Sequence, residues 1–236
     1  HGHTIRYEYG LFKQKIENGY QIELPDQWMQ TGFNWEVRKP KHRVPVKFFG
    51  KIIFNETTGK YEHVDAEEVY AVPYDVPIVG NDTTNTNTLR LWSAEASDNI
   101  PANQDFRQYI QNVRDICQML YPDDSTPAGK MLRLKQEYFF TCAGLNSIVR
   151  AHLRQYPNLN NFHQKNVIQL NDTHPVLAIP ELMRILIDEQ GYEWEEAWDI
   201  TTQTFAYTNH TILAEALETW PISLMQSLLP RVYEII

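Results

Sequence analysis

Two stretches of the sequence share one order of segments: an apolar run, a short polar run and an apolar segment with helical spacing. The first is "VIQLNDTHPVLAIPELMRIL" (167–186), whose polar residues lie at 171–174. The second is "TFAYTNHTILAEAL" (204–217), with Asn209 and His210 between its apolar parts. This order predicts a strand, a loop and a helix in each stretch, and it favours an α/β sheet.

Ligands bind at the carboxyl edge of open α/β sheets, because the loops at that edge follow neighbouring parallel strands. If the two strands are parallel neighbours, we expect Asp172, His174, Asn209 and His210 to line one pocket. A purely structural interpretation is that Asp172 or Thr173 caps the helix that follows. That interpretation explains His174 less well.

The hydrophobic pattern changes near residue 100. Before it, β-branched and aromatic residues in partial alternation predict strands at 44–54, 63–72 and 88–94, with a hairpin turn at 55–60. After it, helical spacing predicts helices from Phe106 to Leu120 and from Leu134 to Val149. Further strands are expected at 166–170 and 204–207, the second of them buried, and further helices at 180–187, 193–202 and 212–220.

Charge and composition exclude some classes of protein and indicate the state of the two cysteines. The net charge of −9 argues against a general nucleic-acid or membrane-surface binder, because such proteins need positive fields. No stretch is long enough to cross a bilayer, and no charged-then-apolar leader is present, so we expect a cytoplasmic protein. Cys117 and Cys142 lie in helix-like apolar patterns and are expected to be buried thiols.

The two ends of the sequence predict a piece of a longer protein. The chain begins "HGHTIRYEYG" without Met and ends "RVYEII" in mid-pattern. His1 and His3 are expected to be disordered rather than to bind a metal. No close pair such as H-x-x-x-H supports a metal site elsewhere, and G-x-S-x-G, G-x-G-x-x-G and P-loop motifs are missing from the sequence. Asn, Asp and His side chains instead suit a polyhydroxylated ligand.

Segments spread in order along nearly the whole chain resemble the glycogen (α-glucan, maltodextrin) phosphorylase family. They are "IRYEYGLFKQKI" (5–16), "VPYDVPIVG" (72–80), "TLRLWSA" (88–94), "LYPDD" (120–124), "RLKQEYFF" (133–140), "IQLNDTHPVLAIPELMR" (168–184) and "AYTNHTILAEALETWP" (206–221). The last two are long and very specific to that family.

The resemblance implies an α/β fold: a portion of the Rossmann-like N-terminal lobe of a two-lobed glycosyltransferase of the GT-B type. Residues 1–100 would be its β-rich antiparallel portion and residues 101–236 its alternating α/β portion. The family transfers a terminal α-1,4-linked glucosyl unit of a glucan to inorganic phosphate and releases glucose 1-phosphate with retention. Its cofactor, pyridoxal phosphate, belongs to a C-terminal lobe absent from this sequence. A homodimer is expected.

The resemblance also implies roles for single residues. His210 matches the histidine whose ring contacts the glucosyl 6-hydroxyl and whose backbone carbonyl faces the reacting sugar, so its expected role is electrostatic positioning. Asp172 and His174 match residues that line a pocket beside the sugar, and Asn209 is expected to bind substrate with them. Glu218 matches a carboxylate near the same pocket, although an exposed helical residue is the alternative interpretation.

Three departures from the family pattern bear on function. The segment "EASDNIPANQDF" (95–106) falls where the family has a mobile gate, with Asp98 and Asn99 as candidates for its tip, but the segment after it is short and lacks a common arginine. Arg150 is followed by Ala151 where regulated animal enzymes carry an arginine pair for a nucleotide phosphate, which argues against nucleotide activation. The lysine motif for the cofactor is missing, so this chain alone is expected to be inactive.

Two other functional classes stay open from the sequence. The chain can be a non-catalytic carbohydrate-binding or regulatory module, or a plain α/β scaffold in which both polar loops are helix caps. The sequence does not distinguish glycogen, starch and maltodextrin as the glucan.

Overall fold

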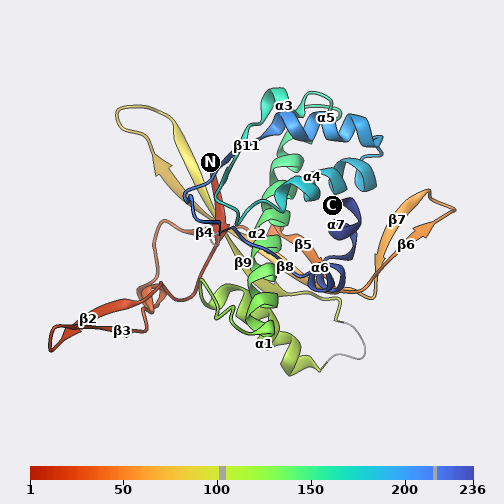
Figure 1. Ribbon diagram of the computed structural model, residues 1–236. Helices are drawn as coiled ribbons and strands as arrows, with labels where there is room; N and C mark the ends of the chain where they lie inside the picture. Colours follow the sequence, from red (N-terminus) through yellow and green to blue (C-terminus); the bar gives the residue numbers. More distant parts are fainter. Residues whose placement is uncertain (101–104, 215–216) are drawn as a thin grey trace. The chain divides into compact units, whose positions relative to one another are not determined.

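The computed structural model describes residues 1–100, 105–214 and 217–236 as a mixed α/β protein (Figure 1). The strands are β1 (Gly2–Ile5), β2 (Lys13–Glu17), β3 (Tyr20–Leu24), β4 (Val37–Arg38), β5 (Val44–Phe48), β6 (Lys51–Asn55), β7 (Lys60–Val64), β8 (Glu67–Val79), β9 (Thr86–Ala96), β10 (Ile168–Asn171) and β11 (Phe205–Thr208). The α-helices are α1 (Phe106–Gln118), α2 (Pro127–Leu153), α3 (Phe162–Lys165), α4 (Ala178–Arg184), α5 (Trp194–Thr204), α6 (Ile222–Leu228) and α7 (Pro230–Ile235). Short 3-10 helices occupy Trp28–Thr31 and Pro40–His42, and a π-helical turn follows α4 at Ile185–Glu189.

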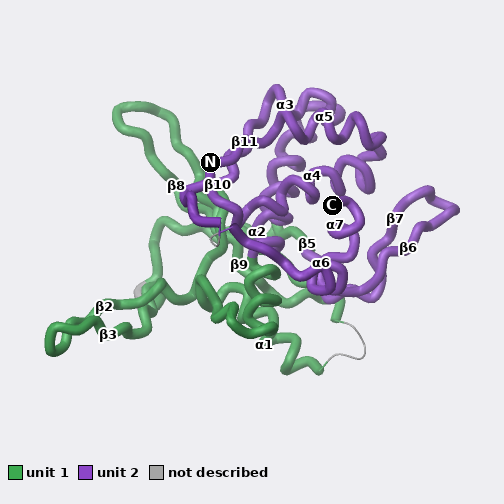
Figure 2. The backbone as a smooth tube through the Cα atoms, in the orientation of Figure 1, with its two compact units in different colours: residues 1–45, 69–136 green, residues 46–68, 137–236 purple. Residues whose placement is uncertain are grey.

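The chain divides into two compact units (Figure 2). The first unit contains residues 1–45 and 69–136, and the second contains residues 46–68 and 137–236. Neither unit is a continuous stretch of sequence, so each is built from segments that are distant along the chain.

A sheet with the strand order β1-β9-β8-β4 organises the first unit. β8 and β9 are long antiparallel partners, from Val69 opposite Ala96 to Val79 opposite Thr86. β1 runs parallel to β9. α1 packs on β9 and buries Tyr109, Val113 and Ile116, because these residues recur on one face of the helix. The predicted helix at 106–120 is therefore confirmed, ending at Gln118.

The expected disorder of His1 and His3 is wrong for His3. His3 belongs to β1 and pairs with Arg90 of β9. Its ring stacks on Trp92, and the indole Nε1–H donates a hydrogen bond of 3.3 Å to Nδ1 of His3. A polar residue near the start of the sequence is ordered here because the neighbouring strand supplies both its backbone and its side-chain partners.

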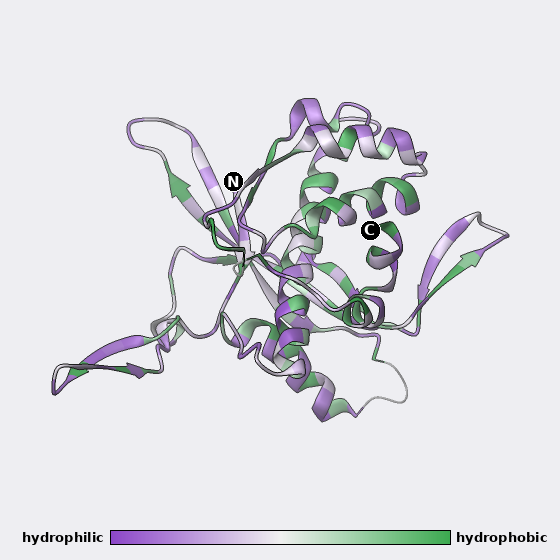
Figure 3. Cartoon of the chain, in the orientation of Figure 1, coloured by the Kyte–Doolittle hydropathy of each residue, from purple (hydrophilic) through white to green (hydrophobic). Residues whose placement is uncertain are grey.

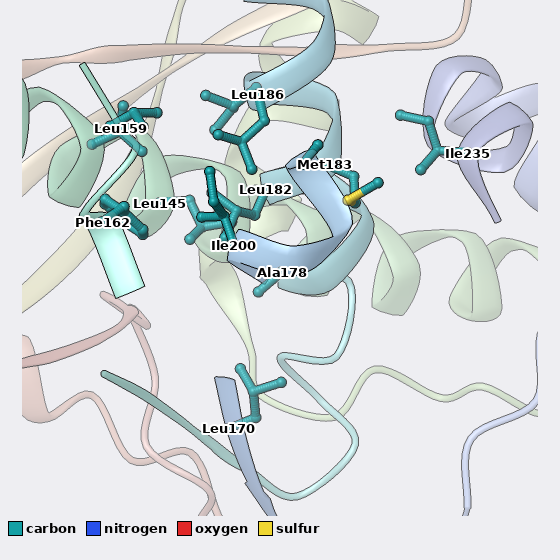
Figure 4. Close-up of a cluster of buried hydrophobic side chains, with 13 residues drawn as sticks. Leu145, Leu159, Phe162, Leu170, Ala178, Leu182, Met183, Leu186, Ile200 and Ile235 are labelled. Atoms are coloured by element: carbon teal, nitrogen blue, oxygen red, sulfur yellow. The ribbon is translucent and has the colours of Figure 1, made fainter. Parts of the chain in front are cut away.

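The core of the second unit is an apolar cluster gathered from α2, α3, β10, α4, the π-helical turn after α4, α5 and α7, with one residue from the loop before α3 (Figure 4). Its members are Leu145, Val149, Leu159, Phe162, Leu170, Ala178, Leu182, Met183, Ile185, Leu186, Ala197, Ile200 and Ile235. The long helix α2 extends the prediction of a helix at 134–149, and α5 confirms the one at 193–202. Leu170 anchors β10 in this cluster while its neighbours Gln169 and Asn171 are exposed, as the twofold side-chain period of a strand requires.

Hydrophobic and hydrophilic residues alternate along the helical ribbons rather than forming long apolar runs (Figure 3). Accordingly, none of the helices in the portion of the chain that the structure describes is long and apolar enough to cross a membrane. Cys117 and Cys142 are both buried and free, as predicted.

Four predictions of secondary structure need correction. The stretch 44–54 is two strands, since Phe49 and Gly50 turn the chain between β5 and β6 with positive φ. The stretch 63–72 likewise holds the end of β7 and the start of β8. β11 is mostly exposed rather than buried. The helix expected at 212–220 is absent from its described residues 212–214 and 217–220, where no α-helix forms.

Candidate functional site: two loops at the ends of parallel strands

The strands before the two polar loops are parallel neighbours. β10 pairs with β11 in a register that sets Asn171 opposite Thr208 at the carboxyl ends of both strands. The backbone N–H of Asp172 continues the ladder by donating to the carbonyl of Thr208 at 2.8 Å. The first loop (172–177) and the second loop (209–214) therefore start side by side, which confirms the predicted arrangement.

Asp172 turns the chain out of β10. Its φ of 67° lies in the left-handed region, which Asp tolerates better than most residues, and its Oδ1 accepts a hydrogen bond of 2.9 Å from the N–H of Thr173. α4 begins only at Ala178, with Leu177 at its N-cap and no side-chain cap. The interpretation of Asp172 or Thr173 as a helix cap is therefore wrong, because several loop residues separate them from the helix.

His210 is joined to the end of β10 by a side-chain hydrogen bond. Its Nε2 lies 2.5 Å from Oδ1 of Asn171. A second contact of the same kind lies two residues earlier, where Nε2–H of Gln169 donates to Oγ1 of Thr208 at 2.7 Å. Asn171 and Gln169 share the exposed face of β10, so both reach across to the neighbouring strand or its loop.

Glu218 contacts the first loop from a segment much later in the chain. Oγ1–H of Thr173 donates to Oε2 of Glu218 at 3.2 Å, and Nε2 of His174 lies 3.9 Å from Oε1 of Glu218. The side chains of His174 and Glu218 are 32% and 22% exposed. The alternative interpretation of Glu218 as an exposed helical residue is therefore wrong: it is partly buried and lies in no helix.

The amide of Asn209 shapes the second loop. Its Oδ1 accepts a hydrogen bond of 3.0 Å from the N–H of Thr211, the pattern of an Asx turn. Oγ1 of Thr211 in turn accepts from the N–H of Leu213 at 3.1 Å. These contacts hold the backbone on the far side of His210, so Asn209 has a clear structural role, and its binding of substrate stays a prediction.

Asp98 and Asn99 belong to the first unit, whereas the other predicted site residues belong to the second. Asp98 is largely exposed and forms an ion pair of 3.5 Å with Arg43. The N–H of Asn99 donates to Oγ of Ser97 at 3.0 Å. The predicted gate at 95–106 includes residues 101–104, which lie outside the described residues.

The structure adds two residues to the predicted cluster. Asn171 contacts His210, and Thr173 contacts Glu218. The only signal in the sequence is their place in the "NDTH" segment, because the contacts depend on the register of β10 against β11.

A cavity of about 420 Å³ lies in the first unit, with Arg6, Glu8, Ser93, Arg114 and Cys117 in its lining. It contains none of the predicted site residues. Over the described ranges, no group of three or more His, Cys, Asp or Glu side chains is placed to hold a metal ion.

Comparison with known proteins gives a consistent result. The sequence model of the carbohydrate phosphorylase family matches residues 1–236. The chain is 50% identical over 238 residues to the glycogen phosphorylase of Bacillus subtilis and 49% identical over 243 residues to that of Pasteurella multocida. It is 46% identical over 252 residues to the muscle form of glycogen phosphorylase from Ovis aries. Each alignment covers all of this chain, which spans about 30% of the length of these relatives.

Proposed function

The chain belongs to the carbohydrate phosphorylase family, and on that premise we propose that it is a segment of the N-terminal lobe of an α-glucan phosphorylase. The whole enzyme would transfer terminal α-1,4-linked glucosyl units to inorganic phosphate, with retention, and release glucose 1-phosphate. We propose for that lobe the Rossmann-like architecture of two-lobed GT-B glycosyltransferases, with residues 1–100 as its β-rich portion and residues 101–236 as its alternating α/β portion. A homodimer and a cytoplasmic location belong to the same proposal.

One observation carries this proposal: the two polar loops start side by side at the carboxyl ends of β10 and β11. The cluster around them combines two carboxylates, Asp172 and Glu218, with two imidazoles, His174 and His210. Carboxylates accept hydrogen bonds, and a neutral imidazole both donates and accepts. A sugar needs such a mixture, because each hydroxyl that loses its partner on binding costs about 1–3 kcal/mol.

In this proposal His210 positions the glucosyl unit and does not attack it. Its ring binds a hydroxyl, and its backbone carbonyl favours the positive charge that develops at the anomeric carbon. Asp172, His174, Asn209 and Glu218 bind the sugar or shape the pocket beside it. Asp98 and Asn99 are proposed for the gate.

Pyridoxal phosphate, the cofactor that the family implies, does not fit the cluster on this chain. A Schiff base needs a lysine amine, and the described residues 171–174, 209–210 and 218 include no lysine. We assign the cofactor to a region of the enzyme that these 236 residues do not include and derive no step through it.

A chimera tests the proposal. The 236 residues replace the matching segment of the Bacillus subtilis enzyme, with which they align without a large change in length. We expect release of glucose 1-phosphate that requires both glycogen and phosphate. His210→Ala should lower kcat/KM about a hundredfold, since an oriented polar group at the reacting sugar is lost.

His42→Ala serves as the matched control, because His42 is exposed in the 3-10 helix Pro40–His42. A folded chimera without activity contradicts the assignment of this segment to a phosphorylase. If the chimera is inactive but the isolated chain binds glycogen, the carbohydrate-binding module is the better explanation. An active chimera that His210→Ala leaves unchanged contradicts the role of the loop cluster.

A further inference from the structure

We propose that Asn171 is a positioning residue that keeps the proton of the neutral His210 ring on Nε2 and leaves Nδ1 as the nitrogen that accepts from a ligand. The consequence for substrate binding rests on the proposed function. The tautomer itself does not, because it is measurable on the chain without any substrate.

The contact atom on Asn171 determines the direction of the hydrogen bond. It is the amide oxygen Oδ1, which accepts and cannot donate. The ring nitrogen Nε2 must therefore carry the proton and donate it. In a neutral imidazole with Nε2 protonated, Nδ1 holds the lone pair.

The backbone holds both partners in place. Asn171 is the last residue of β10 and is paired with Thr208, two residues before His210, so the two side chains are diagonal neighbours across the strand pair. The bond from Asp172 N–H to the Thr208 carbonyl closes the ladder on one side of this contact. The turn made by Asn209 and Thr211 restrains the backbone on the other side.

The tautomer selects the kind of group that His210 binds. His210 is exposed, so Nδ1 can meet a ligand. While the ring is neutral, that nitrogen accepts a hydrogen bond from a hydroxyl, whereas the lone pairs of a phosphate oxygen would repel it. The contact with Asn171 therefore suits His210 to a sugar hydroxyl and disfavours the ring as a phosphate ligand.

Nuclear magnetic resonance of the 236-residue chain with ¹⁵N-labelled histidine tests the tautomer. Long-range couplings between ring protons and ring nitrogens show which nitrogen of His210 is protonated. We expect the proton on Nε2 in the wild-type chain. Asn171→Leu keeps a similar size but removes the acceptor, so we expect a clear share of the form protonated on Nδ1. Asn171→Ala is the second variant if the leucine chain does not fold.

Asn171→Asp is the conservative variant, because its carboxylate has the same shape and can only accept. We expect it to keep a proton on Nε2. Gln169→Leu is the matched control on the same face of β10, since it removes the contact with Thr208 and leaves Asn171 intact. It should leave the His210 signals unchanged. A wild-type ring protonated only on Nδ1, or a tautomer unchanged by loss of the Asn171 acceptor, would overturn the inference.

The chimera then separates this inference from the proposed function. There Asn171→Leu should lower kcat/KM about tenfold, with recovery in Asn171→Asp at pH values where the His210 ring is neutral. If the tautomer depends on Asn171 but the active chimera tolerates both Asn171→Leu and His210→Ala, the positioning contact exists and the role of His210 in the reaction is refuted. If His210→Ala is damaging and Asn171→Leu changes neither tautomer nor rate, the positioning role is refuted alone.

Discussion

His3 is a titratable residue held in a place where it is difficult to charge. It lies in β1 beside β9 and stacks on the ring of Trp92. Burial, together with the nearby Arg90 and the N-terminal amine, lowers its pKa to about 4 against the opposing effect of Asp75. The unfolded chain takes up a proton on this residue near pH 6.5, its ordinary pKa. Between these two pH values the unfolded state binds more protons, so stability falls as the pH is lowered.

We expect His3→Gln to reduce this pH dependence. Glutamine still offers an acceptor to the indole N–H of Trp92 but does not titrate in this range. The loss of unfolding free energy between about pH 6.5 and about pH 4 should shrink by roughly 2 kcal/mol. Urea denaturation followed by tryptophan fluorescence at several pH values measures it. His42→Gln, at an exposed position, is the control, and an equal pH dependence in wild type and His3→Gln contradicts the explanation.

Single residues also determine what the two loops can do. Asp172 accepts left-handed backbone at the end of β10, and the hydroxyl of Thr173 then reaches Glu218. The same few residues therefore turn the chain and supply the polar groups of the candidate site.

At the scale of elements, the turn between β5 and β6 depends on Gly50. Its φ is 77°, and a Cβ at this position would lie 2.3 Å from the carbonyl oxygen of Val64 and 2.9 Å from the N–H nitrogen of Ala66. Gly59, in the turn of the β6–β7 hairpin, has a similar φ of 65° but nothing within 4 Å of an added Cβ. Comparing an alanine substitution at Gly50 with one at Gly59 therefore separates the stability cost of steric overlap from the cost of left-handed backbone.

Gly59→Ala should cost about 1 kcal/mol of unfolding free energy, the usual cost of left-handed backbone for a residue with a Cβ. Gly50→Ala should cost at least about 2 kcal/mol more, because backbone atoms of the neighbouring strand have to move. Thermal and urea unfolding of both variants measure the difference. Equal costs at the two positions would show that the overlap at Gly50 is relieved without penalty.

The pair β10–β11 is the element that makes the candidate site possible. Its parallel register brings Asn171, at the end of β10, into contact with His210 of the second loop, 39 positions later in the sequence. A shift of the register by one residue would turn Asn171 away from His210 and expose Leu170, so the buried leucine and the polar contact support the same alignment.

At the scale of the whole molecule, the described residues of the loop cluster (171–174, 209–210 and 218) include carboxylates and imidazoles and no lysine. We expect the isolated chain, supplied with pyridoxal phosphate, glycogen and phosphate, to release no measurable glucose 1-phosphate. A coupled assay with phosphoglucomutase measures this, with the Bacillus subtilis enzyme as the positive control. Turnover by the isolated chain, abolished by His210→Ala, would contradict the prediction.

The periodicity of the sequence by itself determined most of the elements, because strand and helix patterns are local. It predicted α1, α2, α5 and the strands β10 and β11, and the polar segments after those two strands marked the candidate site. Residues far apart along the chain determined the rest. Partners that local spacing does not encode determine the start of α4 at Ala178, the ordered His3 and the contacts of Asn171 and Glu218. They also determine that residues 217–220 form no α-helix. Only the tertiary structure sets these pairings, since a strand register or a loop contact is stabilised by side chains that meet after the chain has folded.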